Sequence, residues 1–196
     1  IAAGHRDYRM LSLLGTVLLH QGAAPGERNF AEAQAALEES AKDRPDYSAT
    51  QIALGKIYLM LGRNQEAVTQ LEQAVKLTPD DAKLHYDLAL ALNTTGDSGR
   101  VIPELEQAVK LNPQFARAWY NLSLARSAQG DAVGAITALL RAESADPTDP
   151  RIPYARATVL ARMGNLREAR VAARHALELD HNFTTAADLL QQLGGQ

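Results

Sequence analysis

Two short runs in this chain hold residue types that could do chemistry. The run Gly96-Asp97-Ser98-Gly99 places a serine between glycines, as around a nucleophilic serine. That chemistry also needs a histidine and an aspartate brought beside the serine on a matching scaffold, and a motif without this context is only a hypothesis. The pair Gly55-Lys56 has the order of a phosphate-binding loop, but Thr50 stands where its first glycine belongs and Ile57 where serine or threonine belongs. Neither run predicts a catalytic site.

The histidines and cysteines likewise predict no catalytic or metal site. No two of the histidines have the spacing of a helical zinc motif; they are His5, His20, His85, His175 and His181. The chain has no cysteine, which excludes disulfides, iron–sulfur clusters and thiolate zinc sites. We therefore predict no catalytic residue, no metal site and no cofactor, and we expect that the chain is not an enzyme.

A fixed period explains the first run better. Four prolines lie 34 residues apart, and four glycines keep the same spacing; they are Pro45, Pro79, Pro113 and Pro147, and Gly62, Gly96, Gly130 and Gly164. A period of this size is typical of helical-repeat solenoids. The glycine fits the left-handed turn that ends a first helix, and the proline cannot continue a second one. Gly96 is therefore a turn glycine, and Asp97 has a counterpart in Asp131.

Small and apolar residues share this period. The alanines at 74, 108, 142 and 176 let two helices approach closely, and Leu-Glu-Gln-Ala-Val-Lys-Leu occurs at 71–77 and again at 105–111. In the clearest segment, Ala-Arg-Ala-Trp-Tyr-Asn-Leu-Ser-Leu at 116–124 is followed by Gly130-Asp131, Ala135, Leu139, Ala142 and Pro147. This pattern resembles the tetratricopeptide repeat. The resemblance implies an all-α fold, a right-handed superhelical solenoid of antiparallel helix pairs.

We expect residues 1–196 to form one solenoid domain of five repeats and a C-terminal capping helix. The repeats, numbered 1 to 5, are 8–47, 48–81, 82–115, 116–149 and 150–183, and the cap is 184–193. Repeat 1 is longer because of a turn around residues 21–27. Within repeats 2 to 5 we expect helix pairs at 48–61 and 65–77, 82–95 and 98–111, 116–129 and 132–145, and 151–163 and 166–179. Pro103 should kink its helix or make it start late.

Several local contacts are expected as well. Asp97 and Asp131 can cap the helices that follow them. Glu72 with Lys76, and Glu106 with Lys110, have the spacing of favourable pairs within one helix. His85 takes the repeat position of Trp119, which indicates packing rather than ligation. We also expect a core within repeat 4, made of Trp119, Leu122, Leu139 and Ala142.

The resemblance implies that the first helix of each repeat lines a concave groove. Three tyrosines and three basic residues recur there at the 34-residue interval. The candidate groove residues are Lys83, Tyr86, Arg117, Tyr120, Asn121, Leu124, Arg151 and Tyr154. Such a groove would bind an extended or helical peptide segment with apolar and acidic side chains, although tyrosines at these positions can also simply pack. The end of the first two repeats is more apolar, with Leu13, Leu19, Leu59 and Met60, and should meet a further repeat or an apolar helix.

Composition limits the other classes of function. The chain of 196 residues has a net charge of −3 and no basic run, so a nucleic-acid partner has little support. No stretch is apolar for long enough to span a membrane. We favour a protein-interaction module. A structural spacer or self-association arm, and an accessory domain of a larger, exported, enzyme-bearing protein, stay open as alternatives.

The sequence does not determine the cellular compartment of the protein either. The segment at 149–156 is loosely similar to the last repeats of arrays fused to exported multihaem cytochromes, which adds a periplasmic location to a cytoplasmic one. Because the chain starts at Ile1, we expect it to be a processed form or a fragment of a longer protein.

Overall fold

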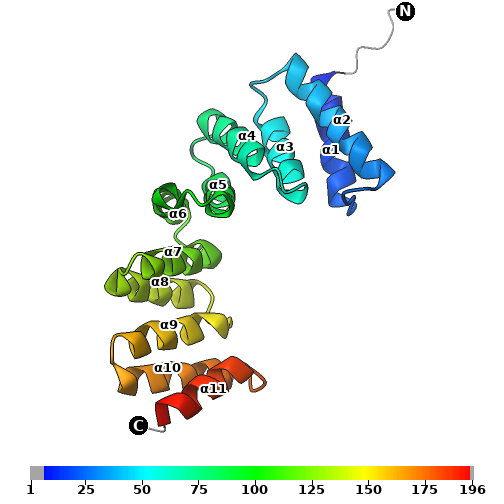
Figure 1. Ribbon diagram of the computed structural model, residues 1–196. Helices are drawn as coiled ribbons and strands as arrows, with labels where there is room; N and C mark the ends of the chain where they lie inside the picture. The colour runs from blue at the N-terminus through cyan, green and yellow to red at the C-terminus, as the bar shows by residue number, and fades with distance from the viewer. Residues whose placement is uncertain (1–6, 195–196) are drawn as a thin grey trace, which may run out of the picture. The chain divides into compact units, whose positions relative to one another are not determined.

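The computed structural model describes residues 7–194, and all regular structure in that part of the chain is helical (Figure 1). The helices are α1 (Tyr8–His20), α2 (Arg28–Asp43), α3 (Ser48–Met60), α4 (Asn64–Leu77), α5 (Ala82–Thr95), α6 (Ser98–Leu111), α7 (Ala116–Ala128), α8 (Ala132–Ala145), α9 (Arg151–Arg162), α10 (Leu166–Leu179) and α11 (Thr184–Gly194). No strand occurs between residues 7 and 194. The expected all-α class is confirmed.

The helices of repeats 2 to 5 lie where the period predicts them, and the turn of repeat 1 separates α1 from α2. The four periodic glycines all have positive φ angles, from 69° at Gly62 to 84° at Gly130. A residue with a Cβ pays a steric cost in this left-handed region, which explains why glycine recurs at the end of each first helix. The capping helix also exists, as α11.

Pro103 was expected to kink its helix or to make it start late. Helix α6 starts at Ser98 and contains Pro103, so the late start is wrong, while the kink stays a prediction. A proline in the second turn removes one hydrogen bond, to the carbonyl group of Gly99. Both residues are exposed, so water can satisfy that carbonyl group.

Three of the expected local contacts need correction. Asp131 caps α8, because its carboxylate accepts the Gly134 N–H at 2.8 Å. Asp97 lies 3.6 Å from the Arg100 guanidinium and accepts no such capping bond. The two glutamates expected to pair within their own helices reach arginines of the following repeat: Glu72 pairs with Arg100 at 2.6 Å, and Glu106 with Arg126 at 2.8 Å. Arginine is long enough to cross between stacked helices.

A recurring hydrogen bond ties each first helix to the turn before it. In three successive repeats, the fourth residue donates a side-chain N–H to the carbonyl oxygen of the periodic proline six residues earlier. The pairs are Gln51 to Pro45 at 2.8 Å, His85 to Pro79 at 2.9 Å and Trp119 to Pro113 at 2.9 Å. His85 is thus a buried structural residue, as expected, and its second ring nitrogen lies 2.7 Å from a Glu104 carboxylate oxygen.

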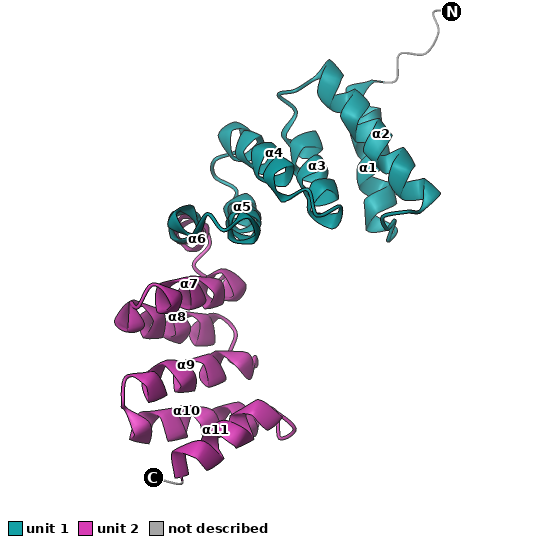
Figure 2. Ribbon diagram, viewed as in Figure 1, with its two compact units in different colours: residues 1–104 teal, residues 105–196 magenta. Residues whose placement is uncertain are grey.

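The chain divides into two compact units within α6: unit 1 is residues 1–104 and unit 2 is residues 105–196 (Figure 2). In unit 1, apolar side chains of α2 and α3 form a buried cluster that includes Phe30, Leu37, Leu54 and Ile57. This cluster fixes α3 beside the first helix pair.

Unit 2 has two buried clusters. In the first, Leu139 and Ala142 of α8 pack with Ile152 and Val159 of α9, and Trp119 lies half-buried against them. The core expected within repeat 4 is therefore shared with repeat 5, because side chains of α8, the second helix of repeat 4, pack against α9, the first helix of repeat 5. In the second cluster, Leu193 of α11 covers Leu160 and the alanines of α10. The capping helix thereby closes the end of this core.

Candidate peptide-binding site

A pocket of about 370 Å³ in unit 2 contains three of the candidate groove residues. Its walls come from the start of α7, the end of α8 with the following turn, and the start of α9. The lining residues are Gln114, Phe115, Ala116, Arg117, Tyr120, Ala145, Asp146, Asp149, Arg151 and Ile152. The period explains the grouping: Arg117 and Arg151 are the second residues of repeats 4 and 5, and Tyr120 is the fifth residue of repeat 4.

One arginine of the pocket is neutralised by a carboxylate. The Arg151 Nη2 atom lies 2.6 Å from Asp149 Oδ2, and its Nε atom donates to Oδ1 at 2.9 Å. This hydrogen bonding holds the pKa of the Asp149 carboxyl below its ordinary value. The Arg151 guanidinium also lies 5.8 Å from the centre of the Tyr120 ring, within the range of a cation–π contact.

Tyr120 and Arg117 differ in how accessible they are. Tyr120 is half-buried, and burial raises the pKa of its phenol, so the ring presents a neutral hydroxyl group beside an apolar surface. Arg117 is exposed and makes no ion pair with any residue between 7 and 194. Arg117 is therefore the cation of this pocket that can pair with a ligand's carboxylate.

The remaining unit 2 candidates lie outside this pocket. Tyr154 packs edge-on against Phe183, with ring centres 5.1 Å apart, and lines a smaller hollow of about 240 Å³ next to α11. Asn121 is half-buried on α7, and Leu124 on the same helix is 46% exposed. The two tyrosines of unit 2 thus line separate hollows.

Lys83 and Tyr86 lie on α5 of unit 1. Lys83 is exposed and forms an ion pair with Asp87, one helical turn away, at 2.5 Å; Tyr86 is half-buried. Two of the three basic candidates therefore have a carboxylate partner that the sequence analysis missed. A signal was present, because Asp87 has the i,i+4 spacing to Lys83, and Asp149 lies two residues before Arg151, which begins α9.

No group of three or more metal-ligating side chains occurs among residues 7–194. Within the same residues, no helix has the length and apolarity needed to cross a membrane.

Comparison with known proteins identifies the repeats. A family model described as TPR repeat matches residues 55–96, and one described as tetratricopeptide repeat matches residues 86–150. The chain is a tetratricopeptide repeat (TPR) protein. The TPR fold supports a role in protein–protein interaction, and TPR proteins are generally non-enzymatic scaffolds. No curated protein sequence matches this TPR chain significantly.

Solved structures share the fold over nearly the whole length. The MamA protein is 25% identical, with 89% of this chain and 92% of MamA covered and a TM-score of 0.80. MamA from Desulfovibrio magneticus RS-1, from residue 41 to its end, is 23% identical, with coverage of 97% and 98% and a TM-score of 0.74. YrrB, a TPR protein with an unusual peptide-binding site, is 17% identical, with coverage of 93% and 91% and a TM-score of 0.82.

Proposed function

We propose that this TPR chain is a non-enzymatic interaction module whose unit 2 binds an extended or helical peptide segment of a partner protein across α7 and α9. The observation that carries this proposal is the pocket around Arg117, Tyr120 and Arg151, which combines a half-buried aromatic ring with an unpaired cation. Its volume lies within the usual range of ligand pockets. YrrB, which has the same fold, is a TPR protein with an unusual peptide-binding site, so peptides are the ligand class to test first.

The charges of the pocket specify the ligand more closely than the sequence did. Arg151 is already paired with Asp149, and Asp146 contributes a second carboxylate to the lining. The pocket therefore suits a segment with one acidic side chain directed at Arg117 and an apolar side chain against Tyr120, rather than a uniformly acidic peptide. Leu124, exposed on α7, extends the apolar contact along the helix. Lys83, Tyr86 and Tyr154 stay predicted contributors at neighbouring repeats.

The first prediction compares two substitutions in binding to one peptide. Peptides selected from a random phage-displayed library against the whole chain are labelled, and their affinity is measured by fluorescence polarisation. Tyr120→Ala should weaken binding by about 30-fold, the effect of removing a central aromatic anchor. Lys83→Ala should change affinity by roughly two-fold or less and act mainly on the salt dependence, because an exposed charge contributes little.

Three results would contradict this proposal. One is equal binding by the Tyr120→Ala variant and the unchanged chain. Another is protection of the second helices α8 and α10, rather than α7 and α9, from hydrogen exchange when the peptide is bound. Recovery of no binding peptide would favour the structural-spacer alternative. The thermal midpoint of each variant shows whether it folds normally.

A further inference from the structure

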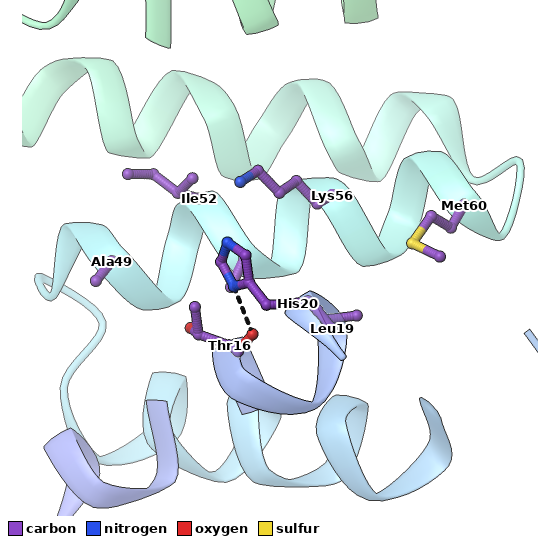
Figure 3. Close-up of a pocket in the computed structure, with 8 residues that line it drawn as sticks. Thr16, Leu19, His20, Ala49, Ile52, Lys56 and Met60 are labelled. Carbon is purple, nitrogen blue, oxygen red and sulfur yellow. Dashed lines mark hydrogen bonds between the residues drawn. The ribbon is translucent and has the colours of Figure 1, made fainter. Parts of the chain in front are cut away.

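A second pocket, of about 370 Å³, lies in unit 1 between α1 and α3 (Figure 3). It is lined by Thr16, Leu19 and His20 of α1 and by Ala49, Ile52, Ala53, Lys56 and Met60 of α3. None of the candidate groove residues belongs to it. Any role of this pocket is therefore additional to the unit 2 site.

The period shows why this pocket is apolar. The second residue of repeat 2 is Ala49, where repeats 3 to 5 have lysine or arginine, and the fifth residue is Ile52, where they have tyrosine. These two replacements remove a charge and a hydroxyl group from the same face of the first helix. The α3 side of this pocket is therefore lined by Ala49, Ile52, Ala53 and Met60, with Lys56 as its only charged residue.

Exposed apolar side chains continue beyond the pocket. Leu13 is 58% exposed and Val17 is 40% exposed, on the same side of α1 as Thr16 and His20 by helical spacing. Met60, at the other end of the pocket, is 46% exposed. Large apolar side chains gathered around a hollow and rimmed by polar groups are typical of interaction surfaces.

The charges at the pocket are of one sign. Lys56 is exposed and makes no ion pair with any residue between 7 and 194, and none of the eight lining residues is acidic. The Nδ1–H of His20 donates to the carbonyl oxygen of Thr16 at 2.8 Å, which fixes the ring beside Lys56 at the middle of the pocket (Figure 3). An unpaired ammonium group beside apolar surface is complementary to a partner's carboxylate.

The shape of the lining indicates how the partner lies. The α3 residues at 49, 52, 53, 56 and 60 form one stripe along the helix, roughly 16 Å long at 1.5 Å per residue. A stripe between two neighbouring helices is a groove into which the side chains of a third helix can pack. We propose that the pocket receives the apolar face of an amphipathic helix from a partner protein, with an acidic side chain of that helix paired to Lys56.

The test uses the whole chain with Tyr120→Ala, so that loss of the unit 2 site cannot be mistaken for loss of this one. The probe is a phage-displayed library of random peptides of roughly 16 residues, about four helical turns. Recovered peptides should carry apolar residues at i, i+3 or i+4 and i+7 with an acidic residue on the same face. They should also become helical by circular dichroism when bound.

Two added substitutions and one control locate the site. Ala49 is exposed, so Ala49→Trp fills the pocket without entering the core and should weaken binding of the selected peptides by about 30-fold. Lys56→Glu should weaken binding by about 10-fold at low salt and less at high salt. Lys76→Glu, at another exposed lysine, which lies on α4 outside the pocket, should leave binding unchanged.

The proposal is overturned if the recovered peptides lack an acidic residue, stay extended, or bind the Ala49→Trp variant equally well. Recovery of no peptide would overturn it too. Dimerisation of the chain that Ala49→Trp abolishes would show instead that a second copy occupies the pocket.

Discussion

At the scale of single residues, the sign of a side chain's charge is a poor guide to what it can bind. Lys83, Arg117 and Arg151 occupy the same position in successive repeats. Asp87 and Asp149 neutralise two of them, and only Arg117 lacks an ion pair with a described residue. The electrostatic attraction for an acidic ligand is therefore concentrated at Arg117.

The ion pair of Asp149 should appear in the pH dependence of stability. The Asp149 carboxyl is 15% exposed, and its hydrogen bonds from Arg151 lower its pKa in the folded chain below the value of about 3.9 for an unfolded aspartate. Its contribution is therefore fully present above about pH 4 and is lost as the pH falls through the folded-state pKa. Asp149→Asn should cost about 1 kcal/mol or less at pH 7, because Arg151 is largely exposed.

Urea unfolding of both chains at a series of pH values measures this effect. The difference in unfolding free energy between the unchanged chain and the Asp149→Asn variant should shrink as the solution becomes acidic. A difference that stays constant with pH would mean that the carboxylate charge of Asp149 contributes nothing.

At the scale of helices, glycine residues allow two neighbouring helices to approach each other closely. A Cβ added to Gly15 in α1 would lie 2.5 Å from Leu37 Cγ and 2.9 Å from the Ala33 carbonyl oxygen of α2. The second contact is with backbone, which cannot turn away as a side chain does. Gly99, in α6, has no neighbour closer than 4.0 Å to an added Cβ.

Alanine at these two glycines should therefore have opposite effects. Gly15→Ala should destabilise the chain by about 1–3 kcal/mol, because the cost of overpacking exceeds the gain in helix propensity. Gly99→Ala should stabilise it by up to about 1 kcal/mol through helix propensity alone. Thermal and urea unfolding of the pair provide the measurement. Stabilisation by both substitutions would show that α1 and α2 are not in close contact at Gly15.

The sequence predicts these helices well because glycine and proline mark their ends by backbone geometry alone. It does not predict contacts that depend on side-chain conformation. Glu72 and Glu106 have lysines at helical spacing, yet they reach arginines of the next repeat. Gln51, His85 and Trp119 each donate a hydrogen bond to the carbonyl oxygen of the periodic proline before their helix. Because the three donors are different residue types, the sequence does not reveal this repeated contact.

In the candidate site too, the sequence predicts where residues lie along the helices but not which side chains contact one another. The period placed Arg117, Tyr120 and Arg151 on corresponding faces, and they line one pocket. Which of the arginines is already paired depends on Asp149, a residue of the turn, whose side-chain direction the period does not determine. The sequence shows the pocket of unit 1 only as apolar residues near the start of the chain, because the period alone does not reveal which surface positions enclose a hollow.

At the scale of the whole molecule, helices α1 to α5 of unit 1 and α7 to α11 of unit 2 pack mainly on their neighbours in sequence, as in other repeat arrays. Stability in such an array is close to a sum of repeat and nearest-neighbour contributions, so damage at one end should stay local. The handedness of a superhelix through all five repeats stays a prediction, and so does the assignment of the chain to one domain.

The capping helix offers a direct test of this locality. Leu193 of α11 is 7% exposed and covers Leu160 of α9 and the alanines of α10. Leu193→Ala should cost about 2 kcal/mol, near the lower limit for a buried leucine because it lies at the end of the core. Hydrogen exchange should quicken in α9, α10 and α11 and stay unchanged in α1 to α4. Val171→Ala, at a residue that is 58% exposed on α10, should change stability by about 0.5 kcal/mol or less. Faster exchange throughout the chain in the Leu193→Ala variant would show that all the repeats unfold together, because the loss of one terminal contact could then lower the protection of helices that do not touch it.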